Sequence, residues 1–102
     1  MIRAIAFYRN QPDARFDFDY YAQKHFPMVM ARLGEFGALR FEVEKGLAMN
    51  DGSAPEFIAT GTVWFKDMDG LQRGLAVHGG EILGDAPNYT NLTPRIQIGT
   101  IV

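Results

Sequence analysis

His25 is the side chain of this 102-residue chain best suited to moving protons near neutral pH. Its imidazole ordinarily titrates near pH ~6.5, so it can accept or release a proton in that range. Asp19, Tyr20 and Tyr21 are sequence neighbours that could orient it or bind a substrate. The predicted catalytic set is His25, Tyr21 and Asp19. The structural alternative is an inward imidazole bonded to a backbone carbonyl.

A second group of residues could bind a ligand. His78 precedes Gly79-Gly80, which would let a ligand or another backbone approach closely; otherwise it is a helix-end histidine bonded to free carbonyls. Large rings such as Trp64 and Tyr89 could line a pocket, although core packing is their commoner role. The predicted ligand-binding residues are Tyr20, Trp64, His78 and Tyr89.

Several other chemistries lack the residues they need. The chain has no cysteine, which excludes disulfides, thiolate chemistry and iron–sulfur clusters. Its two histidines lie far apart in sequence without an evident carboxylate partner, so no metal site is predicted. No glycine-rich phosphate loop is present, and Ser53, the one serine, lies outside any nucleophile motif. We therefore predict no metal and no cofactor.

Composition and charge are those of an ordinary globular domain. The chain is 47% hydrophobic and 22% charged, and its net charge of -2 comes without a concentrated basic stretch. Nucleic-acid binding is therefore not expected. No apolar run reaches the roughly 20 residues of a membrane span, and the N-terminus lacks the apolar core of a signal peptide. We expect one cytoplasmic domain over residues 1–102.

The segment 16–33 is expected to form the helix that positions these groups. Asp17 can cap it by accepting from free N–H groups of the first turn. Phe16 and Tyr21 have the spacing of a hydrophobic staple across that cap. Gly34 is expected to end the helix.

Proline and glycine interrupt both expected helices. Pro27 lacks an N–H and its ring clashes one turn back, which predicts a kink or a fresh helical start directly after His25. A second helix is expected to begin after Asp67. Gly74 and Gly79-Gly80 weaken it, so a bend or split is expected there.

Four segments with β-branched and aromatic residues are predicted to be strands: 2–9, 39–45, 57–65 and 95–102. The resulting order β-α-β-β-α-β is typical of a ferredoxin-like α+β fold. In that fold both helices cover one face of a four-stranded antiparallel sheet.

The other sheet face is expected to meet a second copy of the chain. Aromatic residues make up 13% of the sequence. The helix-free face would carry either Arg3, Ile5 and Phe7 or Ala4, Ala6 and Tyr8, together with residues such as Ile58 and Trp64. Exposed in a monomer, these rings would form a large apolar patch, so we predict a homodimer with facing sheets. A ligand cavity is expected beside the sheet.

Three stretches resemble one known family. They are residues 15–29, which include Lys24-His25-Phe26-Pro27, residues 44–47, and residues 85–94, which include Pro87-Asn88-Tyr89-Thr90. Together they are similar to the EthD family, named for ethyl tert-butyl ether degradation, over almost the whole chain.

The resemblance implies a dimeric α+β barrel. Relatives on that fold include small monooxygenases, polyketide cyclases, decarboxylases, muconolactone isomerases and haem-degrading enzymes. The family's histidine on the first helix matches His25, and the surrounding Asp, Tyr and Pro match Asp19, Tyr21 and Pro27.

The leading functional hypothesis is a small homodimeric protein of a catabolic or oxidative pathway that binds an apolar or aromatic metabolite. If catalytic, it would carry out cofactor-free isomerisation, cyclisation or decarboxylation with His25 as acid or base. One alternative is a non-catalytic accessory protein that sequesters ligand for a partner oxygenase. The other is a haem-binding or haem-degrading protein with His25 or His78 as axial ligand.

Overall fold

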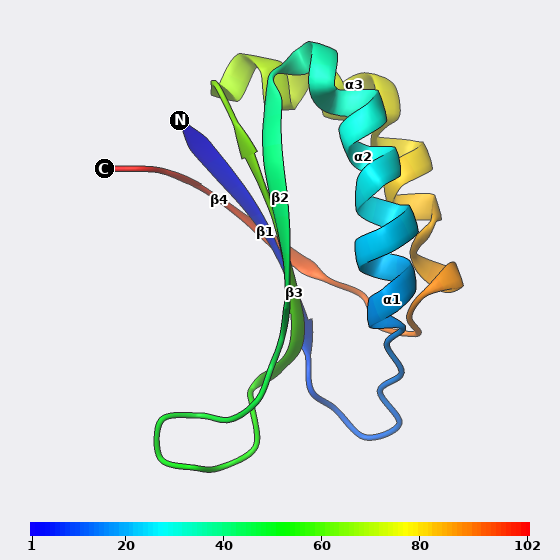
Figure 1. The fold of residues 1–102 in the computed structure, drawn as a ribbon, viewed down its shortest axis with the longest axis vertical. Coiled ribbons are helices and arrows are strands. Elements are labelled where there is room, and N and C mark those ends of the chain that lie inside the picture. The colour runs from blue at the N-terminus through cyan, green and yellow to red at the C-terminus, as the bar shows by residue number, and fades with distance from the viewer.

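Four strands form one antiparallel sheet in the computed structural model, which describes residues 1–102 (Figure 1). The strands lie in the order β2-β3-β1-β4. Their bounds are β1 Ile2–Arg9, β2 Ala38–Lys45, β3 Phe57–Phe65 and β4 Arg95–Thr100. The predicted ferredoxin-like fold is confirmed, with the second strand one residue longer at its start and the fourth ending two residues earlier.

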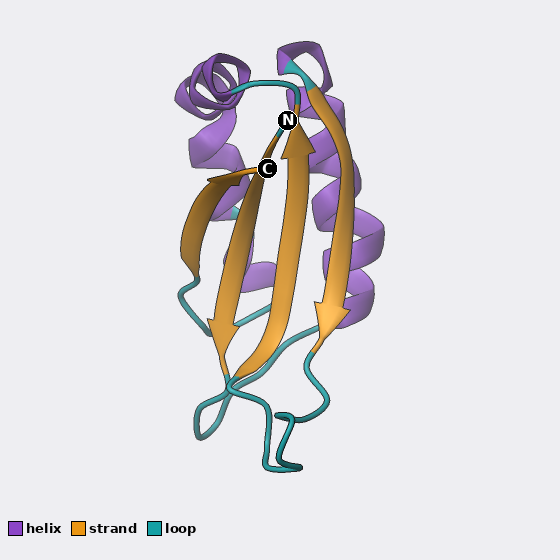
Figure 2. Ribbon diagram, turned by 90° about the vertical axis from the view of Figure 1, so that its left-hand side faces the viewer, coloured by secondary structure: helices purple, strands orange, loops and turns teal.

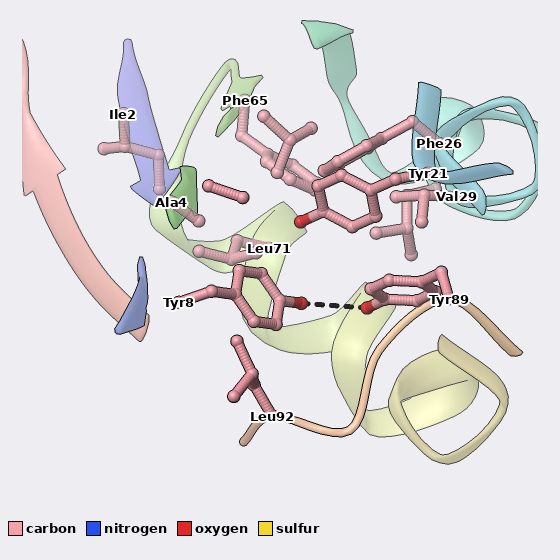
Figure 3. Close-up of a cluster of buried hydrophobic side chains, with 13 residues drawn as sticks. Ile2, Ala4, Tyr8, Tyr21, Phe26, Val29, Phe65, Leu71, Tyr89 and Leu92 are labelled. Carbon is pink, nitrogen blue, oxygen red and sulfur yellow. Dashed lines mark hydrogen bonds between the residues drawn. The ribbon is translucent and has the colours of Figure 1, made fainter. Parts of the chain in front are cut away.

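The helices all cover one face of this sheet, and the other face is bare (Figures 1 and 2). They are α1 Phe18–Tyr20, α2 Phe26–Leu33 and α3 Met68–Gly84. A core of 13 buried residues, drawn in Figure 3, lies between the two layers. Large rings dominate it, among them Tyr8, Tyr21 and Phe65.

Strand pairing decides which residues the bare face carries. Ala4 pairs with Val63 of the core, so Arg3, Ile5 and Phe7 point to the helix-free side. Trp64 pairs with Arg3 on that side, but it is only 7% exposed.

The large exposed aromatic patch expected on this face is not present. The Arg40 guanidinium lies 3.8 Å from the centre of the Trp64 ring and covers it. A bulge opposite Arg9 brings Phe57 to within 5.0 Å of the Phe7 ring, and Ile58 packs instead against the core. The face is therefore a mixture of charged groups and half-buried rings.

The first helical segment begins as the sequence predicts. The Asp17 carboxylate accepts from the Tyr20 N–H at 3.0 Å, and the rings of Phe16 and Tyr21 lie 4.9 Å apart across the cap. These contacts fix the direction in which the helix leaves the loop.

A π-helical turn follows over Tyr21–His25. The Phe26 N–H reaches back to the Tyr21 carbonyl, and α2 starts afresh with Pro27 in its first turn. The fresh start predicted after His25 is thereby confirmed. Pro27 has no N–H to continue the preceding ladder, and π-helical turns of this kind often occur at functional sites.

One expectation about glycine is confirmed, and a predicted split in the second long helix is absent. α2 ends at Leu33 with Gly34 as its C-cap, as predicted. Gly34 keeps helical dihedral angles and begins a short 3-10 turn, and the chain reverses at Gly37, whose φ of 101° favours glycine. α3 is one continuous helix without the predicted split, and the Asp67 carboxylate caps it by accepting from the Gly70 N–H at 2.8 Å. None of the helices has both the length and the apolar character to cross a membrane.

We predict that Gly61→Ala destabilises the fold. A Cβ at Gly61 would overlap the Tyr21 hydroxyl and the Phe26 ring. Overpacking of this kind costs about 1–3 kcal/mol in the free energy of unfolding, measurable by urea denaturation. Gly34→Ala is the matched control, because nothing lies within 4 Å of its Cβ position. Equal stability of the two variants would contradict the close packing of Tyr21 on β3.

Candidate functional site

An apolar cavity of about 350 Å³ lies between the sheet and α3. Hydrophobic residues make up 14 of the 19 that line it, and none of the 19 is Lys, Arg, Asp or Glu. Leu83 of α3 and Ile96 of β4 lie on its rim and are 58% and 52% exposed, so the cavity opens to solvent between these two elements.

His25 meets the cavity from the end of the π-helical turn. Its Nδ1 lies 2.9 Å from the Asp85 carboxylate, which follows the last residue of α3. The other Asp85 oxygen accepts from the Tyr20 hydroxyl and from the Asn88 side-chain amide, each at 2.8 Å. Three donors therefore fix the carboxylate, and the carboxylate fixes the imidazole.

The second ring nitrogen of His25 faces the cavity. Nε2 makes no hydrogen bond within the chain. No buried side-chain nitrogen or oxygen is left without a partner, so Nε2 must border accessible space. The cavity supplies that space, because His25 lines it although only 4% of the residue is exposed. A ligand in the cavity can therefore touch Nε2.

Burial sets the protonation state of this pair. Desolvation lowers the pKa of His25 below its ordinary 6.5 and outweighs the hydrogen bond and charge of Asp85, which act to raise it. Burial acts to raise the pKa of Asp85, but hydrogen bonds from Asn88, His25 and Tyr20 outweigh it and lower that pKa. The pair is thus a neutral imidazole that donates Nδ1–H to a carboxylate, with a free lone pair on Nε2.

A cluster of three buried tyrosines lies beside the imidazole: Tyr8 packs against Tyr21 and Tyr89, and these two contact His25. The Tyr21 ring is nearly parallel to it at 5.2 Å and 16°, and the Tyr89 ring lies 4.8 Å away. The hydroxyls of Tyr8 and Tyr89 are 2.8 Å apart, and that of Tyr21 points into the same region (Figure 3). Burial raises the pKa of all three, so they remain neutral donors at pH 7.

The hydroxyl pair can donate to a ligand. Tyr8 and Tyr89 hold two O–H groups, and the bond between them uses one. The second O–H is left for an oxygen atom in the cavity, which both residues line.

The structure brings only some of the predicted catalytic residues together. His25 and Tyr21 are in contact at the cavity wall. Asp19 is exposed on α1 and makes no hydrogen bond to His25, whose carboxylate partner is Asp85. Sequence reasoning missed Asp85 and Tyr8 as site residues. The nearest signal for Asp85 in the sequence is its place directly before Ala86-Pro87-Asn88-Tyr89, a stretch that carries part of the family resemblance.

Only one of the four predicted ligand-binding residues lines the cavity. Tyr89 lines the cavity, whereas Tyr20 does not: its hydroxyl donates to Asp85 and its ring stacks on that of Tyr89 at 6.1 Å. Trp64 lies on the opposite face of the sheet, under Arg40. His78 packs against the Phe36 ring at 6.0 Å and does not line the cavity. No group of three or more His, Asp or Glu side chains could hold a metal ion.

The buried neutral imidazole predicts how stability depends on pH. His25 takes up a proton near pH 6.5 in the unfolded chain but only at lower pH in the folded chain. The free energy of unfolding therefore falls as pH drops below 6.5. One such group gives a slope of at most about 1.4 kcal/mol per pH unit. Urea denaturation between pH 7.5 and 5.5 should show this slope reduced in His25→Gln and kept in His78→Gln. An unchanged slope in His25→Gln would count against a buried neutral imidazole.

Comparison with known proteins yields solved structures only. No family model and no curated protein matches the chain. An EthD-like protein from Ralstonia eutropha JMP134 is 39% identical, with 99% of this chain and 91% of that chain covered and a TM-score of 0.90.

Two more distant structures share the fold alone. One is a dimeric ferredoxin-like protein from an uncultured marine organism, with 9% identity, coverage of 99% and 93%, and a TM-score of 0.61. The other is a mutant of SnoaB, a cofactor-independent oxygenase from Streptomyces nogalater, with 13% identity, coverage of 98% and 91%, and a TM-score of 0.56. The resemblance in the sequence and the likeness to the Ralstonia protein over nearly the whole chain agree, and the chain belongs to the EthD family.

Proposed function

We propose that this EthD protein binds a neutral, largely apolar molecule and moves a proton on it without a cofactor. The observation that carries the proposal is the free Nε2 of His25, which opens on an apolar cavity while Nδ1 is held by Asp85. A base in this state can take a proton from a bound molecule at neutral pH. Asp85 would keep the tautomer fixed and stabilise the imidazolium that forms.

The proposed step is proton abstraction beside a carbonyl group. Nε2 takes the proton of the α-carbon, the C–H electron pair forms the enolate double bond, and negative charge moves to the oxygen. The hydroxyls of Tyr21 and of the Tyr8–Tyr89 pair would donate to that oxygen, where preorganised donors act most strongly. Return of the proton to another atom of the ligand gives an isomerisation, and attack of the enolate carbon on a second carbonyl gives a cyclisation.

The fold is compatible with such chemistry. SnoaB, which shares it, is described as a cofactor-independent oxygenase. Fold likeness alone does not assign a reaction, so the proposal rests on the His25–Asp85 pair and the tyrosine hydroxyls.

We also propose that the chain forms a homodimer through the helix-free sheet face. Ile5 and Phe7 lie half-buried on that face with no helix over them. One protein that shares the fold is described as dimeric. A second copy would cover these side chains symmetrically.

The proposed base can be tested by hydrogen exchange into a simple ketone. In D2O, the protein should catalyse exchange of the α-protons of 2-tetralone, measured by NMR. His25→Ala should lose about 10²–10⁴-fold in rate, the usual contribution of a positioned base. Asp85→Asn should also lose activity and shift the pH profile, because an amide can donate to Nδ1 and so favour the tautomer that carries its proton on Nε2.

Asp69→Asn is the control for loss of a carboxylate, since Asp69 is exposed on α3 and pairs with Arg73. Exchange no faster than background, or equal rates for wild type and His25→Ala, would refute base catalysis. The ligand-sequestering function would then remain if the protein still binds the ketone.

The proposed dimer predicts a solution mass of twice 11.4 kDa by light scattering. Ile5→Glu should give a monomer, because two buried like charges would face each other across the interface. Val77→Glu is the control, since Val77 is 65% exposed on α3, on the helical layer. A monomeric wild-type protein would contradict the proposal.

A further inference from the structure

Close packing explains two of the glycines in α3, Gly70 and Gly74, but not Gly79 and Gly80. At Gly70 a Cβ would overlap the Phe36 carbonyl, and at Gly74 it would meet the Leu33 side chain at 2.9 Å. Those two glycines let the helix approach its neighbours. At Gly79 the nearest atom to a Cβ would be 3.8 Å away, and at Gly80 nothing lies within 4 Å. Both would tolerate a side chain.

Backbone conformation does not explain these glycines either. The only glycines with positive φ are Gly37 and Gly52, both outside α3. A glycine inside a helix costs about 0.8–1.0 kcal/mol relative to alanine. Inside α3, before its last residue Gly84, the chain therefore carries two unfavourable residues, Gly79 and Gly80, that neither side-chain packing nor backbone dihedral angles require.

Both glycines line the cavity that His25 enters. The opposite wall also carries small side chains, Ala4 and Ala6 of β1. His25 lines the same cavity, and its Nε2 has no partner although the residue is only 4% exposed. A free polar atom beside an apolar cavity indicates a site for a bound molecule rather than a packing defect.

We infer that Gly79 and Gly80 form a seat for a neutral, planar ring compound, one face of which lies on the bare helix backbone. The ring fits a cavity with small residues on two walls. Neutrality follows because no cationic side chain lines the cavity, so a carboxylate, phosphate or sulfonate would be desolvated without a partner. The inference rests on the proposed function only in directing the oxygen atom of the ligand toward His25 and the tyrosines.

The glycine seat can be tested with N-phenyl-1-naphthylamine, a neutral aromatic probe whose fluorescence rises on binding. Gly79→Leu and Gly80→Leu should weaken its binding at least tenfold, because the new side chains occupy the ring position. Their melting temperatures should equal or exceed that of the wild type, since leucine favours helix over glycine.

Gly84→Leu is the matched control. Gly84 is in the same helix and has nothing within 4 Å of its Cβ position, but it does not line this cavity. It should bind the probe as the wild type does. Leucine variants at 79 and 80 that bind within twofold of wild type, or that melt well below it, would overturn the inference.

The charge requirement is tested with 8-anilino-1-naphthalenesulfonate, which adds a sulfonate to the same ring skeleton. Wild type should bind it at least tenfold more weakly than the neutral probe. Equal or tighter binding of the sulfonate, or no binding of the neutral probe, would overturn the ligand class.

The two proposals can fail separately. His25→Ala should keep its affinity for the neutral probe while it loses ketone exchange. If exchange is absent but binding depends on Gly79 and Gly80, the seat stands and base catalysis fails. If exchange is present in the leucine variants at the wild-type rate, base catalysis stands and the seat is wrong.

Discussion

The hydrogen bond between His25 and Asp85 is the interaction on which the rest of the site depends. Its two residues are 60 positions apart, one in the first helical segment and one just after α3. It forms only when the sheet has brought together the helical segment that follows β1 and the helix α3 that follows β3. Because it occupies Nδ1, it leaves Nε2 as the reactive atom, and because burial lowers the pKa of His25, that atom carries a lone pair at neutral pH.

An irregular helical turn places the His25 imidazole on the cavity wall. The π-helical turn over Tyr21–His25 ends where Pro27 prevents an ordinary ladder, and it leaves the Tyr21 and His25 rings stacked at 5.2 Å. Gly61 on β3 has no side chain and so lets Tyr21 lie against the sheet. Features that weaken a helix or a strand when taken alone are therefore the features that bring a ring, a hydroxyl and a base to one wall of the cavity.

Local physics made the fold predictable from the sequence. The caps at Asp17 and Asp67, the alternation of strands and the break at Pro27 are each decided within a few residues. The site was only half predictable because its second half is non-local. His25 and Tyr21 are near each other in sequence, whereas Asp85 reaches them through the fold, and Asp19, although adjacent in sequence, points to solvent. The covering of Trp64 by Arg40 is a cross-strand contact of the same non-local kind.

The aromatic richness of so short a chain now has a physical account. A 102-residue domain has little interior volume, and an open apolar cavity takes part of it away from the core. Tyrosine meets both needs, because its ring packs in the core while its hydroxyl serves the cavity. The rings of Tyr8, Tyr21 and Tyr89 pack edge-on or tilted against one another at 4.7–6.2 Å, and such pairs are worth about 0.5–1.5 kcal/mol each beyond burial. The hydroxyls of Tyr8 and Tyr89 bond to each other, and that of Tyr21 points into the same region (Figure 3). Phenylalanine in their place would keep the packing and remove the donors. The site is thus built from the core itself.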